Sequence, residues 1–213
     1  MANLDSIAQN VLNGNIKKVS DQVNELVNGG TDPIEIINNG LIQGMNLVTP
    51  LFKSGEMFVP EVMRSAKAMN TGMNLLKKYI SDEDIPSKGK VVIGTVEGDL
   101  HDIGKNLVGM MLETSGYTVI DLGVDVKKEN FLDSISKYNP DIIGMSSLLT
   151  TTMIKIKDSI EYLKNKGIPD QIKIIIGGAP VSQKFADEVK ADGYSEDASS
   201  AVALCDSLLA VAK

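Results

Sequence analysis

The sequence has few of the residues that most often carry chemistry. Its 213 residues include one cysteine, Cys205, one histidine, His101, and no tryptophan. A single cysteine excludes both an internal disulfide and a cysteine-rich zinc site. Any reaction that needs an imidazole from this chain must therefore use His101.

An excess of positive charge is also missing. The chain has 28 acidic and 21 basic residues, a formal net charge of −7 and a pI of about 4.8. A surface that binds nucleic acid normally requires clustered basic residues, so we expect no nucleic-acid partner. No apolar run approaches the roughly 20 residues that span a bilayer, and residues 1–12 do not resemble a signal peptide. We therefore expect a cytoplasmic protein with no membrane partner.

The first part of the chain has the hydrophobic rhythm of helices. Up to about residue 80, apolar residues recur at helical spacing and are interrupted by polar and glycine-containing breaks. Pro50 is expected to kink the third helix or end its regular part. Four helices joined by short loops predict a small bundle, which we assign to residues 1–88. The polar segment 81–89 is predicted to be the interdomain linker.

Strands and helices alternate in the remaining part, residues 89–213. Four apolar runs rich in β-branched residues suit strands that are buried on both faces. These runs are 91–96, 118–122, 142–146 and 172–176. A short fifth strand is expected near Gly193-Tyr194. The alternation predicts an α/β domain: a flavodoxin-like, Rossmann-type, doubly wound parallel sheet of five strands in the order 2-1-3-4-5.

Ligands of such sheets bind beyond the carboxyl ends of the strands, near the switch in strand order. The predicted first strand is followed there by His101, with Asp99 two residues before it. A metal-bound imidazole usually donates its other N–H to a carboxylate, and Asp99 could accept it. A solvated loop histidine is the alternative interpretation, and Asp102 could cap the helix that follows.

The segments after the third and fourth strands allow two interpretations each. Gly177-Gly178 could let a flat group approach the backbone, or could form an ordinary strand-to-helix turn. The Ser/Thr run within 146–152 could donate hydrogen bonds to a ligand, or could cap a helix. No GxGxxG or Walker sequence is present, so a nucleotide-binding interpretation lacks its main support.

Taken together, three motifs resemble those of the cobalamin-binding domain family. Asp99-Leu100-His101-Asp102-Ile103-Gly104 matches the D-x-H-x-x-G signature. Ser146-Ser147-Leu148 matches the S-x-L element and Gly177-Gly178 the G-G element, in the same order and spacing. The stretch 51–62 resembles the helical cap module of this family. The size and two-domain plan of the chain resemble those of the free-standing corrinoid proteins of methylamine and methanol methyltransferase systems. The chain also resembles the cobalamin-binding region of methionine synthase.

The resemblance implies that the cofactor is cobalamin or a related corrinoid. His101 is the implied lower axial ligand of cobalt, and Asp99 and Thr152 form the implied relay behind it. The implied cofactor-binding residues are Gly98, Asp99, His101, Asp102, Ile103, Gly104, Ser146, Leu148, Thr150, Gly177 and Gly178.

The same resemblance implies that the bundle covers the methyl-bearing face of the cofactor. Phe52, Val59 and Val62 occupy the implied cap positions. Val59 departs from the leucine found in methionine synthase.

The implied function is that of a corrinoid methyl carrier in anaerobic one-carbon metabolism. A substrate-specific corrinoid methyltransferase would move a methyl group from a methylated amine, betaine or alcohol onto Co(I). A second methyltransferase would pass it from methyl–Co(III) to a thiol or folate acceptor. A reductive activation protein is a further implied partner, and residues 81–89 are the implied hinge. Two alternatives remain open: the cobalamin-binding subunit of a radical mutase, and a corrinoid-based sensor.

Overall fold

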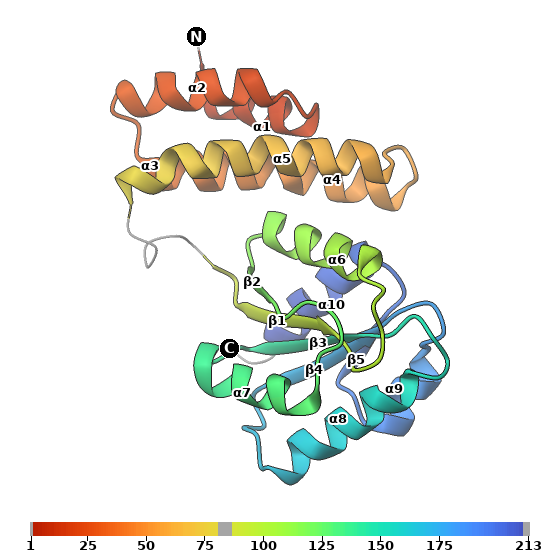
Figure 1. Ribbon diagram of the computed structural model, residues 1–213. Helices are drawn as coiled ribbons and strands as arrows, with labels where there is room; N and C mark the ends of the chain where they lie inside the picture. Colours follow the sequence, from red (N-terminus) through yellow and green to blue (C-terminus); the bar gives the residue numbers. More distant parts are fainter. Residues whose placement is uncertain (1, 81–86, 211–213) are drawn as a thin grey trace. The chain divides into compact units, whose positions relative to one another are not determined.

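The computed structural model describes residues 2–80 and 87–210 (Figure 1). These residues form two compact units: the first contains the residues up to Ser87 together with Thr114–Gly116, and the second contains the remaining residues from Lys88 onward. Most of the predicted linker and hinge, 81–89, lies outside the described residues. No helix in the described ranges is both long and apolar enough to cross a membrane.

The first unit is helical. Its elements are α1 (Leu4–Leu12), α2 (Ile16–Asn28), α3 (Pro33–Ile36), the π-helical segment η1 (Ile37–Ile42), α4 (Gln43–Lys53), α5 (Val59–Leu76) and the 3-10 turn η2 (Lys77–Tyr79). Side-chain caps explain where several helices begin. Asn3 accepts the backbone N–H of Ser6 at 2.7 Å, and Asp32 accepts that of Ile34 at 2.9 Å.

Glycines allow the helices of this unit to approach closely. A Cβ at Gly44 would lie 2.5 Å from the Cβ of Val11, so α4 packs tightly on α1. A Cβ at Gly72 would lie 2.6 Å from Leu41, which brings α5 against η1. Pro50 does not end the helix, because α4 continues through it to its end at Lys53. Proline removes the i→i−4 hydrogen bond that residue 50 would otherwise donate to residue 46.

The second unit is the predicted five-stranded parallel sheet, which the structure confirms. Its strands are β1 (Lys90–Thr95), β2 (Thr118–Asp121), β3 (Ile142–Ser146), β4 (Lys173–Gly177) and β5 (Gly193–Ser195). Its helices are α6 (Ile103–Thr114), α7 (Lys128–Tyr138), α8 (Met153–Asn165), α9 (Gln183–Val189) and α10 (Ala198–Ala210). All strand pairs are parallel, in the order β2-β1-β3-β4-β5.

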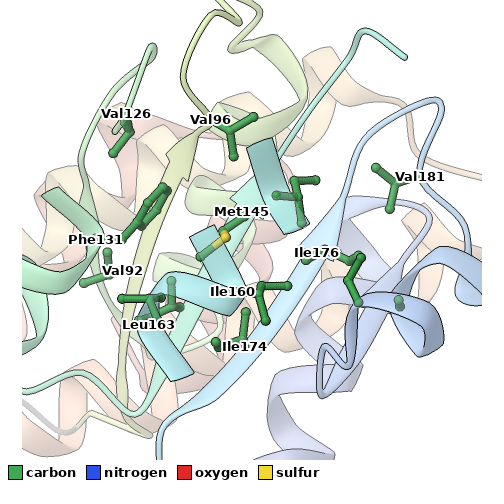
Figure 2. Close-up of a cluster of buried hydrophobic side chains, with 14 of the residues drawn as sticks. Val92, Val96, Val126, Phe131, Met145, Ile160, Leu163, Ile174, Ile176 and Val181 are labelled. Atoms are coloured by element: carbon green, nitrogen blue, oxygen red, sulfur yellow. The ribbon is translucent and has the colours of Figure 1, made fainter. Parts of the chain in front are cut away.

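Both faces of the sheet are covered by helices. Helices α7, α8 and α9 lie on one face and close over a buried apolar cluster that includes Phe131, Met145 and Ile160 (Figures 1 and 2). On α6, a Cβ at Gly109 would lie 2.8 Å from Ile93 of β1. Two-sided burial explains why the strands are continuous apolar runs rather than alternating patterns.

The carboxyl ends of four strands lie level with one another. Thr95 is opposite Ser146, Ser146 is opposite Gly177, and Gly177 is opposite Ser195. The loops after β1, β3, β4 and β5 therefore begin at one edge of the sheet. This register brings the predicted motif segments together.

Candidate functional site

The loop after β1 holds Asp99 against the ring of His101. His101 Nδ1 lies 2.8 Å from Asp99 Oδ1, and the His101 backbone N–H donates to the same oxygen at 3.1 Å. The Asp99 side chain is fully buried, whereas the His101 side chain is 51% exposed. The two residues therefore meet at the carboxyl edge of the sheet, with the imidazole facing outward.

The second oxygen of Asp99 receives donors from the loop after β3. To Oδ2, Leu148 N–H donates at 2.8 Å, Leu149 N–H at 3.3 Å and the Thr152 hydroxyl at 2.7 Å. Burial alone would raise the pKa of Asp99, but the hydrogen bonds from Thr152, Leu148 and His101 together outweigh it. They hold the pKa of Asp99 well below its usual range. Asp99 is therefore an ionised carboxylate at neutral pH.

The charge of Asp99 decides which ring nitrogen of His101 carries the proton. An ionised carboxylate can only accept, so Nδ1 must donate its N–H to Asp99. A neutral imidazole has a single N–H, which leaves Nε2 with a lone pair. In the described parts of the chain, Nε2 has no hydrogen-bond partner. Since the side chain is half exposed, this lone pair is available to a metal.

Thr152 occupies the N-cap position of α8 but does not cap the helix. Its hydroxyl donates to Asp99 and lies 2.8 Å from the Ser147 hydroxyl. At Thr152, the helix-cap interpretation of the Ser/Thr run therefore does not hold, and the hydroxyl orders Asp99 instead.

Exposed apolar side chains flank the imidazole. The exposed fractions are 71% for Leu100, 86% for Ile103, 43% for Leu148 and 40% for Leu149. These residues belong to the loops after β1 and β3 and to the first turn of α6, which meet at Asp99. Exposed apolar residues gathered at one place indicate a surface that binds something. These four side chains, here called the apolar platform, thus lie around an imidazole whose exposed nitrogen could bind a metal.

The motif glycines differ in what surrounds them. Gly178 has a φ of +122°, and a Cβ there would lie 1.9 Å from the Ser147 carbonyl oxygen. The space beside Gly178 is therefore filled by the loop after β3. Gly98 has a φ of +79° and donates its N–H to Asp125 at 2.7 Å. A Cβ at Gly104 would meet no described atom within 4 Å, so this glycine leaves open space in the first turn of α6.

The remaining predicted residues of the second unit lie around the same edge. Ser146 and Gly177 end β3 and β4 side by side. The Ser146 hydroxyl has no hydrogen-bond partner among the residues that the structure describes. Thr150 is exposed in the loop after β3. Asp102 precedes α6, and its carboxylate accepts the side-chain amide of Asn106 at 3.0 Å.

Ser199 was missed by the sequence analysis. It is 3% exposed in the first turn of α10, and its hydroxyl is a buried polar atom without a hydrogen-bond partner in the described ranges. Helix α10 follows β5 and so begins at the same sheet edge. A buried hydroxyl without a partner destabilises a fold, so it indicates a place for a polar ligand atom. In the sequence, the only indication that Ser199 lies at this edge is its position after the predicted fifth strand.

The predicted cap residues lie in the first unit. Phe52 is half-buried near the end of α4, and Val59 is 38% exposed at the start of α5. Val62 is fully buried, so it has no exposed surface to offer a ligand. Phe58 and Met63, which were not predicted, are 66% and 54% exposed. Exposed apolar surface in this region therefore comes from Phe58, Val59 and Met63.

A separate cavity of about 320 Å³ lies between the loop after β2 and α7. Asp125, Asn130 and Lys137 are among its lining residues, and neither His101 nor Asp99 is. The exposed imidazole and its apolar platform, not this cavity, form the candidate site.

Comparison with known proteins agrees with the geometry. A B12 binding domain family matches residues 89–203, and a second B12 binding domain family matches residues 4–77. A corrinoid protein of Desulfitobacterium hafniense is 45% identical over 98% of this chain and 98% of its own length. Dimethylamine corrinoid protein 1 of Methanosarcina acetivorans is 47% identical over 87% of this chain and 88% of its own.

Solved structures give the same result. A chain of the methanol:cobalamin methyltransferase complex of Methanosarcina barkeri superposes with a TM-score of 0.88 and 36% identity. The match covers 96% of this chain and 78% of that one. Family matches to both units, together with relatives aligned along nearly the whole length, show that this chain belongs to the B12-binding corrinoid proteins.

Proposed function

We propose that this protein carries a methyl group on a bound corrinoid between partner methyltransferases. The observation that carries the proposal is the His101 imidazole. Asp99 holds it as the Nδ1–H tautomer, and this leaves an exposed Nε2 lone pair beside an apolar platform. When bound, the corrinoid supplies the cobalt that takes up and releases the methyl group.

The residues at this edge fit a corrinoid. His101 Nε2 is a nitrogen ligand for cobalt, and Leu100, Ile103 and Leu148 offer apolar contact to a flat macrocycle. Gly104 leaves open space next to them. The buried Ser199 hydroxyl, which has no partner in the described ranges, could bind a polar part of the cofactor at the same edge.

The hydrogen-bonded residues behind His101 would fix its tautomer and orientation. The buried Asp99 carboxylate lies 2.8 Å from Nδ1, so the ring keeps its proton there and directs Nε2 outward. Thr152 donates to Asp99 from behind and helps to keep it ionised. The Thr152 hydroxyl in turn lies 2.8 Å from that of Ser147.

The first unit would shield the reactive face of the cofactor. Phe52 and Val59 remain the proposed cap residues, with Phe58 and Met63 as further exposed apolar candidates in the same segment. An apolar cover would exclude water from the methyl group. The cap must move aside for each transfer.

Methylated amines are the methyl donors that the relatives favour. Dimethylamine and trimethylamine corrinoid proteins of Methanosarcina acetivorans are 47% and 44% identical to this chain. A substrate-specific corrinoid methyltransferase would load the group, with a betaine or an alcohol as other donors. A second methyltransferase would transfer it to a thiol or folate, and a reductive activation protein would restore the cofactor.

The test is the visible absorption spectrum of the protein reconstituted with methylcobalamin, recorded for wild type and His101→Ala. We expect stoichiometric binding to the wild type and a spectral difference that reports loss of histidine coordination in the variant. His101→Gln serves as a second variant of similar size. Identical spectra, or no corrinoid retained by folded wild type, would disprove the proposal.

A further inference from the structure

A buried lysine lies near the residues that hold His101. The Lys105 side chain is 3% exposed, and its ammonium group pairs with the carboxylate of Asp121 at the end of β2. Burying an ammonium group is costly unless a partner of opposite charge compensates. Lys105 is also the third residue of α6, where the helix dipole disfavours a cation. Helix stability therefore does not explain why a lysine is buried here.

On the helix side, hydrogen bonds connect Lys105 to the residue next to His101. Lys105 Nζ donates to the side-chain oxygen of Asn106 at 2.7 Å. The Asn106 side-chain amide donates to the Asp102 carboxylate at 3.0 Å. Asp102 directly follows His101 in the chain. These hydrogen bonds therefore connect the pair of Lys105 and Asp121 to the segment that carries His101, at the start of α6.

On the strand side, a second series of hydrogen bonds leads from Asp121 to His101 itself. Asp121 Oδ1 accepts the Gly123 N–H at 2.8 Å, and the Gly123 carbonyl accepts the Thr95 N–H at 3.0 Å. The Thr95 hydroxyl donates to the His101 carbonyl at 3.0 Å. The two series form a closed ring of hydrogen bonds around the His101 backbone, and the pair of Lys105 with Asp121 joins them.

We propose that Lys105 is a positioning residue, which fixes the backbone of His101 through Asp121 so that Nε2 stands where the cobalt binds. Asp99 sets the tautomer and orientation of the His101 ring, whereas Lys105 sets the position of the His101 backbone. This inference rests on the proposed corrinoid binding by His101. It assigns Lys105 no contact with the cofactor.

The first test uses the protein without cofactor. Lys105→Met keeps the apolar stem but removes the charge and the donor. Amide hydrogen exchange over residues 100–106 should become about threefold to tenfold faster, because one link of the ring is lost. Lys173→Met is the matched control, since Lys173 pairs with Asp192 at the start of β4, at the opposite edge of the sheet. Unchanged exchange in folded Lys105→Met would overturn the proposal.

The second test measures histidine coordination in the methylcobalamin-bound protein. In Lys105→Met we expect the corrinoid to stay bound. The ratio of cofactor that His101 coordinates to cofactor that it does not coordinate should fall about threefold to tenfold. This is less than the 10–100-fold effect typical of a direct partner of a metal ligand. Lys173→Met should match wild type. A ratio equal to that of wild type would refute the positioning role.

Asp121→Asn tests the other partner of the pair with a nearly isosteric change, and urea unfolding of each variant separates a folding defect from lost positioning. If Lys105 acts through Asp121, the single variants and the double variant should lose coordination to a similar extent. Losses that add fully would contradict the ring. If wild type itself shows no histidine coordination, the proposed function has failed. If wild type coordinates and both variants match it, only this inference has failed.

Discussion

Gly104 lies in the first turn of α6, where stability and cofactor binding make opposite demands. A Cβ there would meet no described atom within 4 Å, so nothing in the second unit requires a glycine. Alanine is a better helix former, so Gly104→Ala should stabilise the cofactor-free protein by about 0.5–1 kcal/mol. The added methyl group would stand on the apolar platform beside His101, and we expect corrinoid binding to weaken about tenfold or more.

Urea unfolding and a corrinoid titration check the two halves of the Gly104 prediction separately. Gly167→Ala, with a φ of +71° in a turn, is the control that should lose stability without affecting binding. A Gly104→Ala protein that is stabilised yet binds with unchanged affinity would show that the corrinoid does not approach this turn.

At the scale of elements, the loop after β4 depends on Gly178. Its φ of +122° is unfavourable for any other residue, and a Cβ would collide with the Ser147 backbone at 1.9 Å. A backbone atom cannot swing away as a side chain can. Gly178→Ala should therefore lower the free energy of unfolding by about 2 kcal/mol or more, as measured in urea. It should also disturb the loop that orders Asp99, so histidine coordination should weaken. Wild-type stability in this variant would contradict the observed packing.

The C-terminal helix α10 should become less stable at alkaline pH. Burial, with Asp206 adding to it, raises the pKa of Cys205 to about 12. Burial and the hydrogen bond that the Tyr117 hydroxyl donates to Asp206 at 2.7 Å also raise the pKa of Tyr117 above its ordinary value. Unfolding releases both groups to their ordinary pKa values. Above about pH 9 the folded chain therefore holds more protons than the unfolded chain, and its stability falls as pH rises towards 12.

Urea unfolding at pH 8 and pH 10.5 measures this effect. The free energy of unfolding should be lower at pH 10.5, and the difference between the two values should shrink in Tyr117→Phe. A Cys205→Ser variant tests the thiol in the same way. Equal stability at both pH values in the wild type would show that neither group titrates differently on unfolding.

Strand-and-helix order was predictable from the sequence because two-sided burial selects continuous β-branched runs, as in 142–146. The convergence of the motif segments of the second unit was predictable because they follow strands whose ends lie level. Roles that depend on side-chain packing were not predictable from the sequence. The sequence does not reveal that Val62 is buried, or that the Thr152 hydroxyl turns away from its own helix. Nor does it reveal the pairing of Lys105, which joins residues 16 positions apart.

At the scale of the whole molecule, each unit has its own core. The buried cluster that includes Phe131 and Met145 is built entirely from residues after Lys88 (Figure 2). The bundle has separate buried residues, such as Val11, Val23 and Leu41. Each unit therefore has the internal packing that an independently folding domain needs.

A chain that begins at Lys88 should consequently fold and bind methylcobalamin without the bundle. The relay of His101, Asp99 and Thr152 lies wholly within this part, so histidine coordination should persist. If the bundle covers the methyl group, the bound cofactor in the shortened chain should exchange with free corrinoid faster than in the full chain. Visible spectra, circular dichroism and an exchange time course measure these properties, with His101→Ala in the shortened chain as the control. A folded short chain that exchanges no faster would argue against the cap, whereas an unfolded one would show that the second unit depends on the first.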